Sequence, residues 1–148
     1  MKQANAWFSC LLFFTVTALA QEPKSGRIVV NTDGYKSEKG FAMIALHNTS
    51  HTFLKKKEPF RKERIAITLG TAKAVFNDIP YGTYSIAVFH DENSNFDLDA
   101  SIVGIPKEDY GFSNNARKKY GPPKYNDTLF TLDAAEKTLE IRVAPAIP

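Results

Sequence analysis

The residues best suited to chemistry lie in the segment HDENSNFDLD, which runs from His90 to Asp99. In a tight loop, side-chain oxygens at every second position can turn toward one centre. Calcium is a hard cation that takes about six to eight such oxygens. The segment therefore predicts a calcium site, and calcium is the one cofactor that the sequence indicates. The predicted ligands are Asp91, Asn93, Asn95, Asp97 and Asp99.

Two positions depart from the D-x-[DN]-x-[DN] calcium loop that this spacing otherwise matches. Phe96 stands where such a loop has a glycine for its sharp turn, and Ile102 stands where it has a bidentate glutamate. Glu92, Glu108 or Asp109 could complete the shell instead. The alternative is a solvated loop whose Asx side chains cap their own backbone. Both interpretations stay open at the level of sequence.

A second cluster follows in the segment Gly104–Ala116, which combines two rings with acids, amides and a serine. Aromatic faces beside amides and carboxylates suit a sugar or another polar small molecule. They equally suit a long loop that packs on its own side chains. The candidate ligand-binding residues are His90, Glu108, Tyr110, Phe112, Ser113 and Asn114.

A catalytic role has weaker support in the sequence. Ser113 lies in YGFSN, which lacks the second glycine of a hydrolase nucleophile elbow. His47 and His51 have no metal-ligand spacing to His90. We therefore predict a non-enzymatic protein with no catalytic residues. The alternatives are an envelope-associated hydrolase, built from Ser113, His90 and an acid, or a protein that binds a polar small molecule.

The first 20 residues are expected to be a targeting segment. Lys2 precedes an almost purely apolar run, and Ala18-Leu19-Ala20 has the small-x-small pattern that signal peptidase recognises. The run is shorter than the roughly 20 apolar residues of a spanning helix, although a retained anchor is the alternative. We expect a signal peptide over 1–20 and a single domain over 21–148. The mature protein should be a periplasmic or secreted monomer without a stable membrane span.

Composition narrows the chemistry further. The one cysteine, Cys10, lies in the apolar run, so the predicted mature domain has no disulfide, thiolate ligand or cysteine nucleophile. The chain has 19 Lys and Arg against 16 Asp and Glu, and this near balance gives no reason to expect nucleic acid as a partner. The basic run Phe53–Arg64 could contact anionic lipid headgroups, although such a run is more often a solvated loop.

Strand patterns surround these clusters. Period-two alternation and β-branched residues predict strands over 27–31, 40–47, 64–69, 73–76, 83–90, 128–132 and 138–143. The last two should form a terminal pair, and the segments 48–62 and 91–126 should be irregular. About seven short strands separated by turns predict an all-β fold. The expected architecture is a single antiparallel two-sheet sandwich with one long functional-looking loop.

One local motif strengthens the sandwich prediction. The segment DIPYGTY, Asp78–Tyr84, places a tyrosine two residues after a glycine at the start of a strand. This is the spacing of a tyrosine corner, in which the phenol hydrogen-bonds to upstream backbone. The alternative is a plain turn with a core tyrosine, and Tyr84 is structural in both cases.

These segments also carry a family resemblance. The blocks His90–Asp99 and Gly104–Ala116, together with Pro122-Pro123 and the upstream segment Phe76–Tyr84, resemble the bacterial domain of unknown function 2141 family. The resemblance covers essentially the whole predicted mature chain. Family members usually have glycine where this chain has Ser94 and Phe96.

The resemblance implies location and fold rather than chemistry. It implies an exported, β-rich accessory domain of the immunoglobulin or transthyretin-like kind, with no assigned activity. We therefore expect an exported, non-enzymatic binding or accessory β-sandwich with a candidate calcium loop at Asp91–Asp99. Its ligand would be an envelope partner or a polar molecule of unknown identity.

Overall fold

The computed structural model describes residues 24–55 and 58–146 of the chain. The predicted signal peptide over 1–20 lies outside the described residues. Within them, the helical elements are two short 3-10 helices, η1 (Ser113–Asn115) and η2 (Tyr125–Thr128). No helix among these residues has the length and apolar character to cross a membrane. The predicted all-β class is confirmed.

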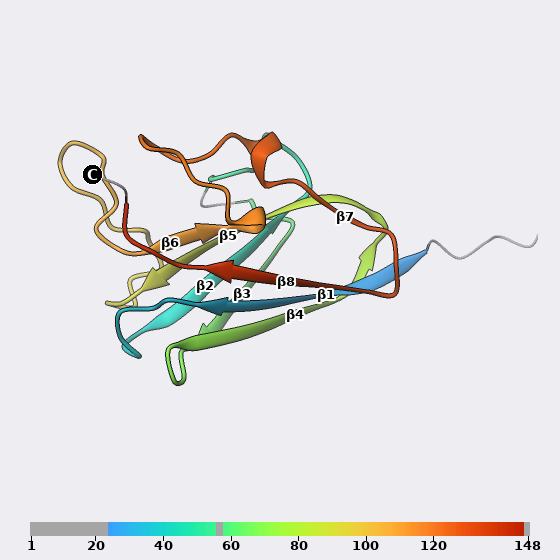
Figure 1. Ribbon diagram of the computed structural model, residues 1–148, viewed down its shortest axis with the longest axis horizontal. Coiled ribbons are helices and arrows are strands. Elements are labelled where there is room, and N and C mark those ends of the chain that lie inside the picture. The colour runs from blue at the N-terminus through green and yellow to red at the C-terminus, as the bar shows by residue number, and fades with distance from the viewer. Residues whose placement is uncertain (1–23, 56–57, 147–148) are drawn as a thin grey trace, which may run out of the picture.

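The described residues form eight strands in two sheets, one strand more than expected. The smaller sheet has the order β4-β1-β8, and Figure 1 shows its strands running side by side. They are β1 (Ser25–Asp33), β4 (Thr71–Pro80) and β8 (Glu136–Arg142). The larger sheet has the order β3-β2-β5-β6, and β7 also pairs with β5. Its strands are β2 (Phe41–His47), β3 (Arg61–Ala66), β5 (Gly82–Asp91), β6 (Tyr110–Phe112) and β7 (Phe130–Leu132).

The core lies between the two sheets and is built from alternate residues of each strand. In β4, the side chains of Ala72, Ala74 and Phe76 are buried, and those of the residues between them are exposed. Each large apolar side chain removed from water in this way contributes roughly 1.5–3 kcal/mol to folding. The largest fully buried apolar side chains come from both sheets: Ile28, Ile44, Leu46, Ile79, Ile86, Leu132 and Ile141.

Two strand boundaries differ from the sequence-based expectation. Strand β3 begins at Arg61, inside the segment predicted as a loop, and ends at Ala66, so the predicted strand over 64–69 is wrong in part. The first four residues of β3 are charged and exposed, because β3 is an edge strand with little apolar alternation. Strand β6 lies inside the stretch predicted as irregular, and its three residues are too few to produce a period-two pattern.

The predicted terminal pair is wrong. Strand β7 pairs with β5 in the larger sheet, and β8 pairs with β1 in the smaller one. The chain therefore changes sheets between Leu132 and Glu136. The β1–β8 pair is also parallel, so the sandwich is not antiparallel throughout. The parallel pairing of β8 with β1 brings apolar side chains of β8 to the core. In this register Leu139 lies opposite Val30, and Ile141 lies opposite Thr32.

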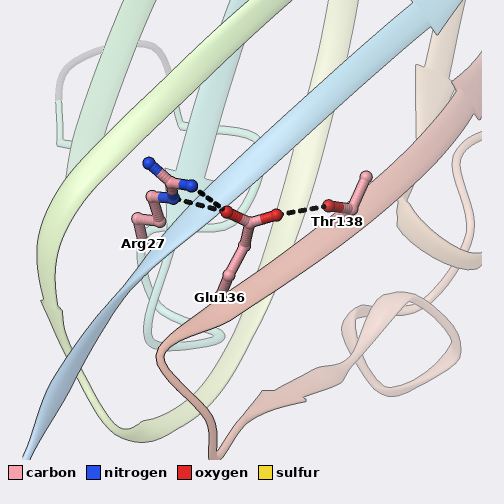
Figure 2. A network of polar contacts seen from close by, with 3 residues as sticks. All are labelled: Arg27, Glu136 and Thr138. Carbon is pink, nitrogen blue, oxygen red and sulfur yellow. Dashed lines mark hydrogen bonds and ion pairs between the residues drawn. The ribbon is translucent and has the colours of Figure 1, made fainter.

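A polar network lies on the surface of the parallel pair. Figure 2 shows the Arg27 guanidinium on the carboxylate of Glu136, which also accepts a hydrogen bond from the Thr138 hydroxyl. Arg27 and Glu136 are directly opposite in the register. Their side chains are 58% and 41% exposed, so the pair contributes about 1 kcal/mol or less. The main-chain ladder therefore holds β8 against β1.

Gly111 allows the edge strand β6 to approach β8. A Cβ atom at this position would lie 2.6 Å from the carbonyl oxygen of Arg142 and 3.0 Å from a methyl carbon of Ile141. The neighbouring Tyr110 exchanges backbone hydrogen bonds with Ala144. The missing side chain therefore lets one end of the larger sheet close against the C-terminal segment.

The tyrosine corner is present. The Tyr84 hydroxyl donates a hydrogen bond to the carbonyl oxygen of Pro80 at 2.7 Å. Its ring centroid lies 5.9 Å from that of Phe60 and 6.4 Å from that of Phe130. Tyr84 therefore ties the β4–β5 turn to the edge of the core.

We expect Tyr84→Phe to lower the free energy of unfolding by about 1 kcal/mol, because it removes this hydrogen bond and keeps the ring. Urea unfolding followed by circular dichroism measures the change. Tyr120→Phe is the matched control, since Tyr120 is 75% exposed. Equal stability of Tyr84→Phe and the parent would show that the hydroxyl contributes nothing to the corner.

Candidate functional site

Two buried carboxylates organise the loop that follows β5. Asp91 is fully buried, and its two oxygens accept hydrogen bonds from the backbone N–H groups of Asn95 and Phe96 at 3.0 and 3.1 Å. Glu108 accepts from the backbone N–H groups of Glu92 and Asp99 at 2.9 and 3.0 Å. Both carboxylates therefore accept hydrogen bonds from backbone N–H groups of the loop and stabilise its conformation.

The amides of the loop continue this network. The side-chain nitrogens of Asn93 and Asn95 donate to the two oxygens of Asp99 at 2.7 and 3.1 Å. The side-chain oxygen of Asn95 accepts from the backbone N–H of Asp97 at 2.8 Å. The structure thus brings the predicted calcium ligands into one network, in which side-chain oxygens of Asp91, Asn93, Asn95 and Asp99 accept hydrogen bonds from the loop itself and Asp97 takes part through its backbone N–H.

This arrangement has the features of the self-capping alternative. In the part of the chain that the structure describes, no group of three His, Cys, Asp or Glu side chains is placed to hold a metal ion. A calcium ion would have to replace several of the internal hydrogen bonds. Calcium binding by Asp91, Asn93, Asn95, Asp97 and Asp99 stays a prediction.

That prediction has a direct test. If the loop binds calcium, a millimolar concentration should raise the melting temperature by roughly 5 °C over chelator, because a ligand of the folded state stabilises it. Asp99→Ala should abolish the rise. Asp133→Ala, which removes an exposed acid between β7 and β8, should keep it. Identical melting curves with calcium and with chelator would contradict calcium binding.

Phe96 holds the loop down on the larger sheet. The Arg64 guanidinium lies 3.3 Å from the ring centroid of Phe41 and 4.7 Å from that of Phe96, so it is stacked between two rings. Such cation–π contacts contribute about 0.5–1 kcal/mol each when exposed. Phe96 and Ser94 have positive φ angles of 67° and 62°. The stack is a physical reason for a phenylalanine at a position where glycine would relax the backbone.

The other predicted ligand-binding residues divide into two groups. Ser113 is fully buried and accepts a hydrogen bond from the backbone N–H of Ile86, and Asn114 donates to the carbonyl oxygen of Leu129. His90 contacts the carbonyl oxygen of Lys39 through Nε2 at 2.8 Å. These three side chains, like Glu108, join segments of the scaffold. Tyr110 and Phe112 have a different position, described below.

Asp109 carries the remaining buried charge of this region. Its carboxylate is 1% exposed, and the Lys36 ammonium lies 2.7 Å from its Oδ1 atom. Neither oxygen has a hydrogen-bond partner among the described residues, and the contact with Lys36 is an ion pair. The ion pair compensates the buried charge and joins the β1–β2 connection to β6.

The outer face of the larger sheet forms an apolar groove. In β5, Ala87 and Phe89 point away from the core, and the register places Ala45 and Met43 of β2 opposite them. Phe112 and Tyr110 of β6 continue this floor on the other side of β5. The hollow above the floor has a volume of about 710 Å³. We call it the outer groove.

Three connecting segments rise around the outer groove. They contribute Leu54 and Pro59, the stretch from Phe96 to Pro106, and the stretch from Lys119 to Pro122. Five of the eight large hydrophobic side chains that are exposed in the described residues line it. They are Leu54, Phe96, Val103, Ile105 and Tyr120. Contiguous exposed apolar patches are uncommon on monomeric proteins, so this cluster is a candidate interaction site.

One histidine closes an end of the groove. His47, the last residue of β2, is 2% exposed, and its Nδ1 atom has no hydrogen-bond partner among the described residues. Its ring meets the Phe53 ring edge-on at 5.7 Å. Burial lowers the pKa of His47, and the polar backbone of Thr52 nearby opposes part of this shift. The imidazole is therefore neutral at neutral pH.

The lowered pKa of His47 predicts acid sensitivity. As the pH falls below the ordinary histidine pKa of about 6.5, the unfolded chain binds a proton at His47 before the folded chain does, so stability falls with the pH until the folded imidazole is protonated as well. We expect the urea midpoint to drop less between pH 7.5 and pH 5.5 in His47→Phe than in the parent. His51→Phe, which changes an exposed histidine, should behave like the parent. An equal drop in His47→Phe and the parent would contradict the assignment.

Sequence reasoning missed the outer groove as a site. The available signal was that FAMIALH and SIAVF are apolar at nearly every position, which is typical of strands covered on both faces. Tyr110 and Phe112 were proposed as ligand-binding residues, and both lie on the floor of the groove. The surrounding walls come from segments too far apart in the chain to form a local motif.

Fold and site together define a β-sandwich with an open apolar groove on the outer face of its larger sheet. A family model described as "Uncharacterized protein conserved in bacteria (DUF2141)" matches residues 30–140. The chain belongs to this family, as the sequence resemblance indicated. No curated protein and no solved structure matches the chain. The immunoglobulin or transthyretin-like part of the expectation therefore stays a prediction.

Proposed function

We propose that this chain is an exported, non-enzymatic binding protein whose ligand site is the outer groove. The observation that carries the proposal is the apolar floor of β2, β5 and β6, left open beneath three raised connections. An antiparallel sheet with one solvated face normally presents polar side chains there. The exposed apolar area costs free energy in the absence of a ligand, and a bound molecule would cover it.

Size and lining support a small-molecule ligand. Pockets for small molecules have volumes of about 300–1,000 Å³ and mostly apolar walls with few polar groups. The outer groove, at about 710 Å³, falls in this range. The charged residues that line it are Lys55, Lys62, Glu63 and Lys119. The proposal therefore departs from the polar ligand expected from the sequence, since this lining favours a ligand with an apolar body.

The non-enzymatic part of the proposal rests on the side chains that could do chemistry. A hydrolase would need a nucleophile within reach of a general base in a pocket. Ser113 is bonded to the backbone of Ile86, and His90 contacts Lys39. Neither side chain lines the outer groove. The export part rests on the signal peptide predicted for residues 1–20.

An uncharged apolar dye such as N-phenylnaphthylamine tests the proposal. We expect the dye to gain fluorescence with the exported protein, and Ala87→Trp, which fills the floor, to weaken its binding at least about tenfold. Val75→Trp is the matched control, because Val75 lies on the outer face of β4 in the other sheet. Phe89→Ser serves as a second variant if Ala87→Trp does not fold.

Two results would contradict the proposal. Dye binding that is absent in the parent, or unchanged in both groove variants, would remove the outer groove as the site.

The intact mass of the protein used in this assay tests export, because the predicted cleavage leaves Gln21 as the first residue. A mass that retains residues 1–20 would contradict cleavage.

A further inference from the structure

The charged residues of the outer groove are unevenly placed along it. Lys62 of β3 lies beside Ala45, and the next outward residue of β2 is His47, at the end of the strand. Lys55 comes two residues after Phe53, whose ring contacts those of His47 and Phe112. Lys55 and Lys62 therefore share the end of the groove that is closed by His47. We call this the basic end.

The lining side chains at the opposite end of the groove are apolar or aromatic, and the guanidinium groups of Arg64 and Arg117 near this end lie over aromatic rings. Met43 of β2 pairs with Phe89 of β5, and Phe89 pairs with Tyr110 of β6. Side chains of the loop after β5 add to this end, among them Phe96, which is held over Phe41 by the Arg64 stack. About two residues of strand, or roughly 7 Å, separate the pair Ala45–Ala87 from the pair Met43–Phe89.

The lysines of the groove lack acidic partners in the described part of the chain. None of Lys55, Lys62 and Lys119 forms an ion pair with a described residue, and the ammonium of Lys119 lies 5.5 Å from the ring centroid of Tyr120. Glu63 is the only acid among the lining residues. Three cations against one anion make the groove attractive to a negative group beside an apolar surface.

We propose that the ligand of the outer groove is a single-chain anionic amphiphile of the fatty-acid type. Its carboxylate would lie at the basic end, near Lys55 and Lys62, and its hydrocarbon chain would extend over Phe89 toward Phe96. This inference rests on the proposed function and adds the chemical class of the ligand. The gradient from charged to apolar lining matches the two parts of such a molecule, and a neutral apolar ligand would leave the lysines unused.

Calorimetric titration with two probes of equal chain length tests the inference. Dodecanoate carries the anionic head, and dodecyltrimethylammonium carries a cationic one, and both are used below their micelle-forming concentrations. We expect dodecanoate to bind at least about tenfold more tightly, because the heads meet the lysines with opposite sign. Its affinity should also fall as the salt concentration rises.

A charge-neutralised variant assigns the preference to the lysines. Replacing Lys55, Lys62 and Lys119 together by Gln should weaken dodecanoate binding about tenfold, and it should reduce the affinity for the uncharged N-phenylnaphthylamine far less. The matched control replaces Lys24, Lys73 and Lys137 by Gln. It removes the same charge from residues that do not line the groove, and it should bind dodecanoate like the parent.

The outcomes separate this inference from the proposed function. Equal affinity for the two amphiphiles, with the dye still bound, would overturn the anionic ligand and leave the groove as a binding site. Failure of both the dye and the amphiphiles to bind would overturn both proposals. Binding to vesicles of anionic phospholipid without binding of monomeric dodecanoate would overturn the inference in favour of a membrane surface.

Discussion

Strand β5 pairs with β2 along one edge and with β6 and β7 along the other, so its backbone is hydrogen-bonded on both sides. Its side chains are needed on both faces as well. Ile86 and Val88 are buried in the core, and Ala87 and Phe89 form the middle of the groove floor. A one-residue shift in the register of β5 would exchange these two sets. The pairing of β5 with its neighbours therefore determines both which side chains enter the core and which form the groove floor.

The ends of β5 carry the two local structures that fix its neighbours. At its start, Tyr84 reaches back to the carbonyl of Pro80 and sets the turn from β4. At its end, Asp91 holds the backbone of the following loop through Asn95 and Phe96. The loop is thereby positioned to raise one wall of the groove. Its acids are used to satisfy backbone donors, and this use competes directly with cation binding for the same oxygens.

The sequence alone predicted those features of the fold that depend on local residue patterns. Strands β1, β2, β4 and β5 follow from alternation, and the tyrosine corner follows from the placement of Tyr84 two residues after Gly82 at the start of a strand. The pairing of β8 with β1 was missed because its partner is more than a hundred residues away in the chain. The acidic loop was located correctly, but the same Asx spacing supports both cation binding and self-capping. The groove has no local pattern, since its lining is assembled from distant segments.

The charged edge strand β3 has a consequence for how other molecules reach this sheet. The outer edge of β3 has no partner strand in the described sheet order. Its first four residues are charged and exposed, and they are Arg61, Lys62, Glu63 and Arg64. Consecutive charges on an edge strand disfavour the addition of a further strand, because an incoming chain would have to desolvate them. Addition of an extended peptide along β3 is therefore disfavoured, and a molecule that binds the outer groove would approach it through the open face of the sheet.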